Sequence, residues 1–98
     1  MRFLPVCAIL LALGAVPAFA SAAEGKAIYN TKCKMCHKAD GSGIPAMGMK
    51  PLGSAAVQSK TDAELKKAIT GGIGKMRPQT VTAKQADDLV EFIRTFKK

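Results

Sequence analysis

The sequence predicts an all-α fold with about three main helices joined by long loops. Two segments begin with a capping box, in which Thr is followed three residues later by Glu or Gln: Thr61 with Glu64, and Thr82 with Gln85. Both segments then repeat apolar residues at helical spacing, whereas we find no convincing strand pattern. At 98 residues the chain forms at most one domain.

Three segments carry the helical pattern. The first runs from about Ala23 to Lys34, and the second follows the first capping box and ends at Gly71-Gly72. Ser54 to Gln58 has room for one short helical turn between them. The third segment follows the second capping box. Its apolar stripe consists of Leu89, Phe92, Ile93 and Phe96.

Residues 1–20 have the pattern of a secretory signal peptide. Met1-Arg2 gives a positive start, an apolar run follows, and Ala18-Phe19-Ala20 forms a small-x-small cleavage site. The apolar run is shorter than the roughly 20 residues that a membrane span requires. We expect cleavage after Ala20, with cleavage two or three residues later and a retained anchor as alternatives. The mature domain of residues 21–98 is then expected to have no stable membrane insertion.

The segment Cys33-Lys34-Met35-Cys36-His37 has the C-x-x-C-H pattern of a c-type haem attachment site. Residues three and four apart share a face of a helical turn, so both cysteines can reach one edge of a flat macrocycle, one thiol to each vinyl group. His37 follows and can turn its ring under the iron. The pattern therefore predicts one covalent haem c with Cys33 and Cys36 as attachment points and His37 as an iron ligand.

Three other uses of the cysteine pair have less support. A structural zinc site needs four ligands, but the chain has no second cysteine pair and His37 is its only histidine. A thioredoxin-like site is expected beside a βαβ pattern, which we do not find. A plain disulfide between Cys33 and Cys36 is the simplest alternative.

The composition also favours a bound cofactor. A mature chain near 80 residues builds a marginal core and usually needs a cross-link or a cofactor to stabilise it. Aromatic residues make up only 5% of the chain and Trp is absent, which is little for a core of its own. Covalent haem would supply apolar surface, and export agrees with it because haem is attached to c-type cytochromes outside the cytoplasm.

These motifs together resemble those of class I c-type cytochromes, most closely the small single-haem bacterial type. The resemblance extends from Glu24 to Lys98. It rests on the segments Gly25-x-x-x-Tyr29, Cys33-Lys34-Met35-Cys36-His37, Ala39-Asp40-Gly41-x-Gly43, Gly72-x-Gly74-Lys75-Met76 and Leu89-x-x-Phe92-Ile93. It implies a small cytochrome c fold in which the first and last helices cross at these glycine and aromatic positions.

The same resemblance implies two further roles beside the haem. The family's distal ligand is a Met in the loop before the last helix, so the iron would have His37 and Met76 as axial ligands. Met47 and Met49 also follow His37 in a loop and are alternative ligands, although lining the haem pocket is their simpler role. A proline carbonyl commonly holds the proximal imidazole in this family, which assigns that contact to Pro45.

We therefore expect an exported, periplasmic electron carrier rather than an enzyme. Haem iron with His and Met in both axial positions changes between Fe(II) and Fe(III) with little rearrangement. The sequence contains no catalytic constellation that competes with this function. The alternatives are a cytochrome subunit of a dehydrogenase complex and a ligand-binding haem protein with a labile Met ligand.

The charge of the chain indicates what kind of partner it meets. Lys and Arg number 15 against 7 Asp and Glu, which gives a net charge of +8. For an exported protein this favours redox partner proteins with acidic surfaces over nucleic acid. A generally basic surface is the alternative to a localised ring. The residues expected around the exposed haem edge are Lys32, Lys34, Lys38, Lys75 and Arg77.

Overall fold

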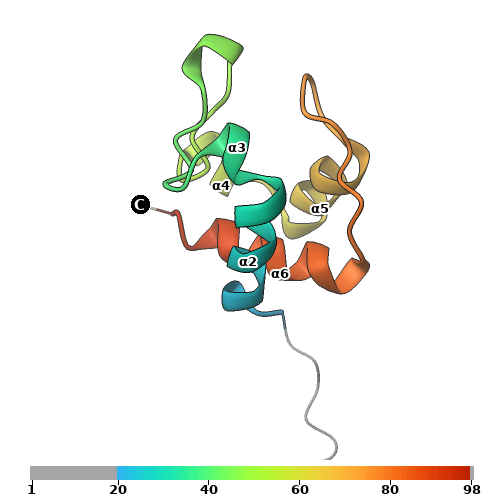
Figure 1. Ribbon diagram of the computed structural model, residues 1–98. Coiled ribbons are helices and arrows are strands. Elements are labelled where there is room, and N and C mark those ends of the chain that lie inside the picture. The colour runs from blue at the N-terminus through green and yellow to red at the C-terminus, as the bar shows by residue number, and fades with distance from the viewer. Residues whose placement is uncertain (1–19, 98) are drawn as a thin grey trace, which may run out of the picture.

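The computed structural model describes residues 20–97 of the chain. The predicted signal peptide lies outside the described residues except for Ala20, so its cleavage stays a prediction. The helices of the described part are α2 (Ala22–Lys32), α3 (Lys34–His37), the short 3-10 helix η1 (Pro45–Met47), α4 (Ala55–Gln58), α5 (Asp62–Gly71) and α6 (Ala83–Arg94). Figure 1 shows α2 crossing α6 near the centre of the molecule, which confirms the predicted all-α fold.

The first predicted helix differs from the structure at its C-terminal end. α2 ends at Lys32, and Cys33 separates it from α3 with φ −116° and ψ −33°. The Cys33 N–H still donates to the Tyr29 carbonyl at 2.9 Å, as in a continuing helix. Its own carbonyl, however, accepts from the N–H groups of both Cys36 (3.2 Å) and His37 (2.9 Å). A new turn therefore begins at Cys33, and the C-x-x-C-H motif forms a short helix of its own.

The crossing of α2 and α6 depends on a glycine. A Cβ atom on Gly25 would lie 2.0 Å from the Asp88 carbonyl oxygen and 2.9 Å from the Phe92 Cβ. Beside this contact the ring centroids of Tyr29 and Phe92 are 5.0 Å apart, and those of Tyr29 and Phe96 are 5.6 Å apart. The structure thus places the glycine and aromatic positions of the first and last helices together, as the resemblance implied.

Both predicted capping boxes are present. The Thr61 hydroxyl accepts from the Glu64 N–H at 3.1 Å, and the Thr82 hydroxyl accepts from the Gln85 N–H at 3.1 Å. Each cap satisfies N–H groups that a helix N-terminus leaves without partners, so α5 and α6 begin where the sequence predicted. The short turn predicted from Ser54 to Gln58 is α4.

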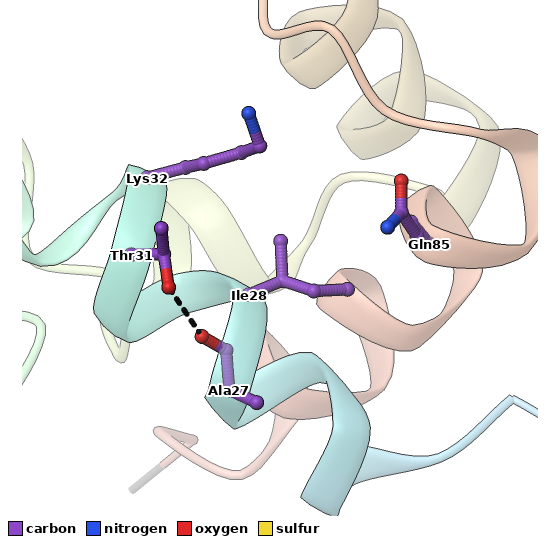
Figure 2. Close-up of a pocket in the computed structure, with 5 residues that line it drawn as sticks. All are labelled: Ala27, Ile28, Thr31, Lys32 and Gln85. Atoms are coloured by element: carbon purple, nitrogen blue, oxygen red, sulfur yellow. Dashed lines mark hydrogen bonds between the residues drawn. The ribbon is translucent and has the colours of Figure 1, made fainter.

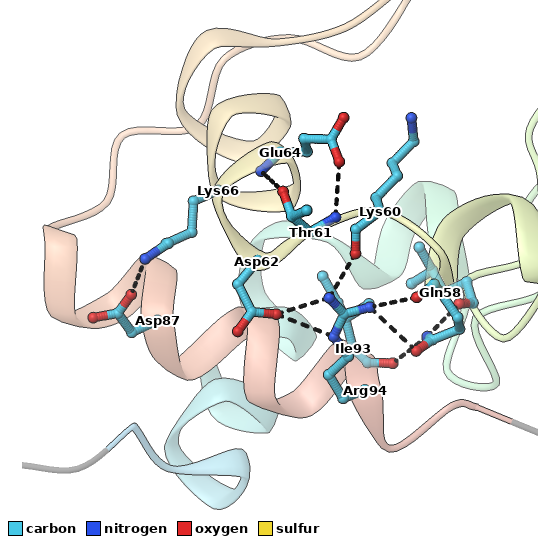
Figure 3. Close-up of polar contacts among 10 residues, drawn as sticks. Gln58, Lys60, Thr61, Asp62, Glu64, Lys66, Asp87, Ile93 and Arg94 are labelled. Atoms are coloured by element: carbon cyan, nitrogen blue, oxygen red, sulfur yellow. Dashed lines mark hydrogen bonds and ion pairs between the residues drawn. The ribbon is translucent and has the colours of Figure 1, made fainter.

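Arg94 connects the end of α6 to the segment between α4 and α5, as Figure 3 shows. Its guanidinium donates to the carbonyls of Gln58 (3.0 Å) and Lys60 (2.7 Å) and to the Asp62 carboxylate (2.7 Å). The Gln58 side chain in turn donates to the Leu52 carbonyl at 2.8 Å. These contacts hold the end of α4 and the start of α5 against α6.

One buried apolar cluster joins the helices. It consists of Tyr29, Leu52, Leu65, Ile69, Leu89, Val90 and Ile93. Leu89, on α6, is completely buried in this cluster. Among residues 20–97, no helix combines the length and the apolar character needed to cross a membrane.

Candidate functional site

A cavity of about 660 Å³ lies beside this cluster. Its volume falls in the range of roughly 300–1,000 Å³ that is usual for sites of small molecules and cofactors. The motif helix α3, the loop containing η1, α5 and the loop before α6 all contribute to its walls. In Figure 1 the loop that contains η1 (green) and the loop before α6 (orange) stand at the top of the molecule, on opposite sides. Apolar side chains, among them Leu65, Ile69 and Leu89, form much of the lining.

The structure brings all three predicted residues of the C-x-x-C-H motif to this cavity. Cys33, Cys36 and His37 line it together, on the single turn that begins at Cys33. Both cysteines are free thiols here, Cys33 half-buried and Cys36 exposed, so the disulfide alternative is not realised in this structure. Burial raises the pKa of the Cys33 thiol, although the neighbouring Lys32 charge acts in the opposite direction.

The zinc alternative finds no ligand set in the described residues. Within residues 20–97, no group of three or more His, Cys, Asp or Glu side chains is placed to hold a metal ion. The donors that do converge on the cavity are two thiols, one imidazole and methionine sulfur. Thiols and axial His or Met are the groups by which proteins hold a covalent haem, so the donor set fits that cofactor.

His37 has the environment of a metal ligand. Its Nδ1 atom is buried and has no hydrogen-bond partner among the described residues, although buried polar atoms are usually paired. Burial lowers the pKa of the imidazole, which favours the neutral ring at neutral pH. The neutral ring is the form that ligates metals. A neutral imidazole that lines an apolar cavity therefore fits the predicted role of proximal ligand.

The contact predicted for Pro45 is absent from this structure. Pro45 is exposed and is not among the residues that line the cavity. It opens the 3-10 helix η1, and its carbonyl accepts from the Gly48 N–H at 2.9 Å. The turn thus uses the carbonyl that was expected to accept from the His37 imidazole, and the role of Pro45 beside the haem stays a prediction.

Three methionines line the cavity, and their surroundings differ. Met47 on η1 is 42% exposed, whereas Met49 and Met76 are half-buried. The Met49 sulfur accepts a hydrogen bond from the Ile44 N–H at 3.4 Å, which ties it to its own loop. Met76 instead packs against the buried cluster from the loop before α6. Met35, between the two cysteines, is 92% exposed and lies outside the lining.

A tight turn fixes the backbone of Met76. Its N–H donates to the Ile73 carbonyl at 2.9 Å, and the Ile73 N–H donates to the Met76 carbonyl at 3.1 Å. Gly72, at φ 78°, permits the close return of the chain, because a Cβ there would lie 2.8 Å from the Met76 carbonyl oxygen and 2.9 Å from the Pro78 Cδ. The Gln79 N–H then donates to the Ile69 carbonyl at 2.8 Å, which attaches the far end of the loop to α5.

Tyr29 is a site residue that sequence analysis assigned only to the helix crossing. It lines the cavity, is 1% exposed, and its hydroxyl donates to the carbonyl of Lys38, the residue after His37. Lys38 has φ 68°, a left-handed conformation that residues other than glycine rarely adopt. Burial, helped by the nearby Cys33 and Asp40, raises the pKa of Tyr29 to about 12, so the hydroxyl stays a donor. Tyr29 thus fixes the chain where it leaves the motif.

The cavity has a basic edge. Of the predicted ring, Lys32, Lys75 and Arg77 contribute to the lining, whereas Lys34 and Lys38 are exposed but lie outside it. Two lining lysines were not predicted, because the η1 loop and the segment between α4 and α5 bring them to the cavity from distant parts of the sequence. They are Lys50 and Lys60. None of the described residues that line the cavity is acidic.

A second hollow, of about 260 Å³, lies between α2 and α6 (Figure 2). Figure 2 shows Ile28 extending toward Gln85 across this space, while the Thr31 hydroxyl donates to the Ala27 carbonyl at 3.1 Å. Lys32 completes the lining, which contains no Cys, His or Met among the described residues. The donors suited to a cofactor therefore face the larger cavity.

Comparisons with known proteins find a matching family and similar solved structures. Residues 20–93 match the model of the family described as cytochrome C oxidase, cbb3-type, subunit III. Among solved structures, the KustC0563 c-type cytochrome superposes with a TM-score of 0.67 at 27% sequence identity. The alignment covers 76% of this chain and 98% of that chain. No curated protein matches the sequence.

Proposed function

The chain belongs to this family of c-type cytochromes, and from that premise we propose that it is an exported carrier of single electrons between redox proteins. The membership and the likeness to the solved c-type cytochrome confirm the predicted small cytochrome c fold and its cofactor, one covalently bound haem c. When bound, haem supplies an iron that changes between Fe(II) and Fe(III). The roles of individual residues are part of the proposal.

We assign the attachment of haem to Cys33 and Cys36, whose thiols form thioether bonds with its two vinyl groups. His37 and Met76 are the proposed axial ligands. The observation that carries this assignment is the convergence of all four side chains on one apolar cavity. In Figure 1 the motif helix α3 and the loop before α6 stand apart, with α5 and α6 below them, so His37 and Met76 approach from different elements.

The surroundings of the methionines support Met76 as the distal ligand. The turn with Ile73 and the close approach of Gly72 fix its backbone. A fixed ligand loses little freedom on binding, and filling both axial positions leaves none open to gases or peroxide. This supports an electron carrier over a ligand-binding haem protein.

Export is proposed from residues 1–20, which have the three parts of a secretory signal peptide. Haem attachment to c-type cytochromes takes place outside the cytoplasm, so the leader and the C-x-x-C-H motif agree with one another. We place the mature protein in the periplasm.

Two measurements on the exported protein test the proposed function. Its intact mass should equal the mature chain plus one haem, and the haem should resist extraction with acidified solvent. The visible spectrum of the reduced protein should not change when carbon monoxide is added, because His37 and Met76 occupy both axial positions. A spectrum that changes at once with carbon monoxide would support the ligand-binding alternative instead.

Acidic redox partners are proposed from the basic edge of the cavity. Lys32 and Lys75 are exposed and line the cavity, whereas Lys26 and Lys97 are exposed and lie outside it. Electrostatic steering raises association rates and weakens with salt. Replacing Lys32 and Lys75 with Gln should therefore slow electron transfer to an acidic partner about tenfold at low salt, and far less at high salt. Equal slowing by the matched pair Lys26 and Lys97 would point to the generally basic surface instead.

A cytochrome subunit of a larger redox complex is the second candidate. The sequence led us to a dehydrogenase complex, whereas the family description names an oxidase subunit. Purification from membranes and from the soluble fraction of the periplasm separates the two candidates. A free carrier elutes as a small single-chain protein, and a subunit elutes with its complex.

A further inference from the structure

Asp88 is the one carboxylate of the described residues that is fully buried, at 1% exposed. It lies on α6 where Gly25 lets α2 come close. Its Oδ1 accepts from the backbone nitrogen of Ser21 at 2.8 Å, and Lys84 donates to both carboxylate oxygens, at 2.8 and 3.0 Å. Neither Asp88 nor Ser21 lines the cavity, so this site is separate from the haem-binding residues.

Ser21 is held firmly in place at this contact. It is the N-cap of α2: its hydroxyl accepts from the Glu24 N–H at 3.3 Å, and its carbonyl accepts from the Gly25 N–H at 2.9 Å. With its oxygen atoms fixed by the helix, its backbone nitrogen is directed at the Asp88 carboxylate. This nitrogen follows Ala20, the residue after which the leader is expected to be removed.

Among residues 20–97, the charged groups around Ser21 are not balanced. The side chains concerned are Glu24 on α2 and Lys84 and Asp88 on α6, and Lys84 also pairs with Glu24 at 3.3 Å. Two carboxylates thus share one ammonium. Cleavage between Ala20 and Ser21 would convert the amide nitrogen of Ser21 into an α-ammonium and supply the missing positive charge.

We propose that Ala20–Ser21 is the processing site and that the new α-ammonium of Ser21 forms a buried ion pair with Asp88, which locks α2 onto α6 in the mature protein. The inference rests on the export proposed above. A positive charge at a helix N-terminus is normally unfavourable because it opposes the helix dipole. Here the Asp88 and Glu24 carboxylates offset that cost. The hydrolysis itself needs only water, which adds across the peptide bond.

The structure also distinguishes among the three cleavage positions that the sequence allowed. Cleavage after Ala22 or Ala23 would remove Ser21, and with it the N-cap of α2 and the bond to Asp88. Cleavage after Ala20 keeps the cap and adds a charge to it. N-cap residues stabilise helices, so of the three cleavage positions only the one after Ala20 keeps the stabilisation of α2 by Ser21.

The test uses the exported, haem-bearing protein and a matched variant with one alanine inserted between Ala20 and Ser21. In that variant, cleavage after Ala20 leaves Ser21 with an uncharged amide N–H, and the α-ammonium moves one residue away. Intact mass first shows where each chain begins. Reductive methylation with ¹³C-formaldehyde then labels the α-amine, and NMR titration of the reduced protein gives its pKa. We expect the α-amine of the native mature chain to titrate at least about one pH unit above that of the variant.

Thermal denaturation of the unlabelled proteins gives a second readout. We expect the native mature chain to melt about 4–8 °C above the alanine-inserted variant at pH 7. Because the folded α-amine has a raised pKa, this difference is complete below the ordinary α-amine pKa of about 7.7–8.0 and disappears as the pH rises through the folded value. Asp88→Asn should abolish the difference while leaving the haem spectrum unchanged.

The outcomes separate this inference from the proposed function. A mature chain that begins at Ala23 or Glu24 overturns the processing site, and equal α-amine pKa values with equal melting temperatures overturn the ion pair. In both cases the protein is still an exported electron carrier. A chain that retains its leader, by contrast, overturns the export proposal together with this inference.

Discussion

The crossing of α2 and α6 and the cavity beside the buried cluster differ in how their polar and apolar groups are paired. At the crossing, Gly25 brings two backbones into contact, and the one buried carboxylate, Asp88, has a partner on both oxygens. At the cavity, the buried Nδ1 of His37 has no partner among the described residues, and Ile73 is 56% exposed. At the crossing, protein groups satisfy the buried carboxylate, whereas the groups of the cavity are suited to a bound cofactor.

This difference explains how a chain of this size can be stable. Apolar surface that faces water instead of a packed neighbour forgoes roughly 25 cal/mol per Å² of stabilisation. Haem bound in the cavity would cover the apolar side chains of its walls, so the crossing and the caps hold the elements together while the haem provides the second half of the core. Mutations at the crossing should therefore change stability alone, whereas mutations at the cavity should change the binding of haem as well.

Removal of the haem attachment points should have the largest effect. We expect Cys33→Ala with Cys36→Ala to yield a haem-free chain without a cooperative thermal transition, because the cavity loses its filling and the unfolded chain loses a covalent constraint. Circular dichroism on heating measures this. Met35→Ala is the matched control: its side chain is 92% exposed between the two cysteines, so haem content and melting should be unchanged. A haem-free double mutant that melts cooperatively with native helix content would show that the crossing suffices alone.

A substitution at the crossing should destabilise the protein without altering the haem site. Gly25→Ala places a Cβ atom 2.0 Å from a backbone oxygen, so we expect a loss of about 1–3 kcal/mol in the free energy of unfolding. Denaturant titration of the holoprotein measures it. Gly71→Ala is the control within a helix, since a Cβ there meets nothing within 4 Å and should be neutral or stabilising by up to about 1 kcal/mol. Equal effects of the two substitutions would contradict the close crossing.

A smaller effect is expected where the two regions meet. Tyr29 packs in the crossing through its ring and fixes the motif through its hydroxyl, which donates to the Lys38 carbonyl. Tyr29→Phe keeps the ring and removes the hydrogen bond, so it should cost about 0.5–1.5 kcal/mol of stability. If Tyr29 also positions the residue after His37, the reduction potential should shift while haem content stays the same. An unchanged potential would limit Tyr29 to a role in packing.

The sequence predicted those parts of the fold that depend on local chemistry. Capping residues satisfy nearby N–H groups, and a C-x-x-C-H turn is a property of five consecutive residues, so both could be recognised without a structure. The break at Cys33 could not, because Cys33 continues the hydrogen bonding of α2 and only its carbonyl starts a new turn. The helix was therefore predicted to extend to Lys34, two residues beyond the observed end of α2.

The contacts that sequence analysis missed are all between distant residues. Asp88 resembles a solvated residue at i+4 from Lys84, and its burial follows only from the approach of Gly25 on another helix. The contacts of Arg94 with the α4–α5 segment span more than 30 residues. The turn at Pro45 is of the same kind, because an assignment by resemblance does not reveal that its carbonyl also accepts from the Gly48 N–H within η1.

We propose that the haem is held from both sides of the cavity, by His37 and by Met76. The most direct measurement is the sulfur-to-iron charge-transfer band in the spectrum of the oxidised protein. Met76→Ala should abolish this band, lower the reduction potential and open the iron to carbon monoxide. Met49 lines the same cavity, but its sulfur accepts a hydrogen bond from the Ile44 N–H. The Met49→Ala variant should therefore keep the band. A band that survives in the Met76 variant and disappears in the Met49 variant would contradict the account.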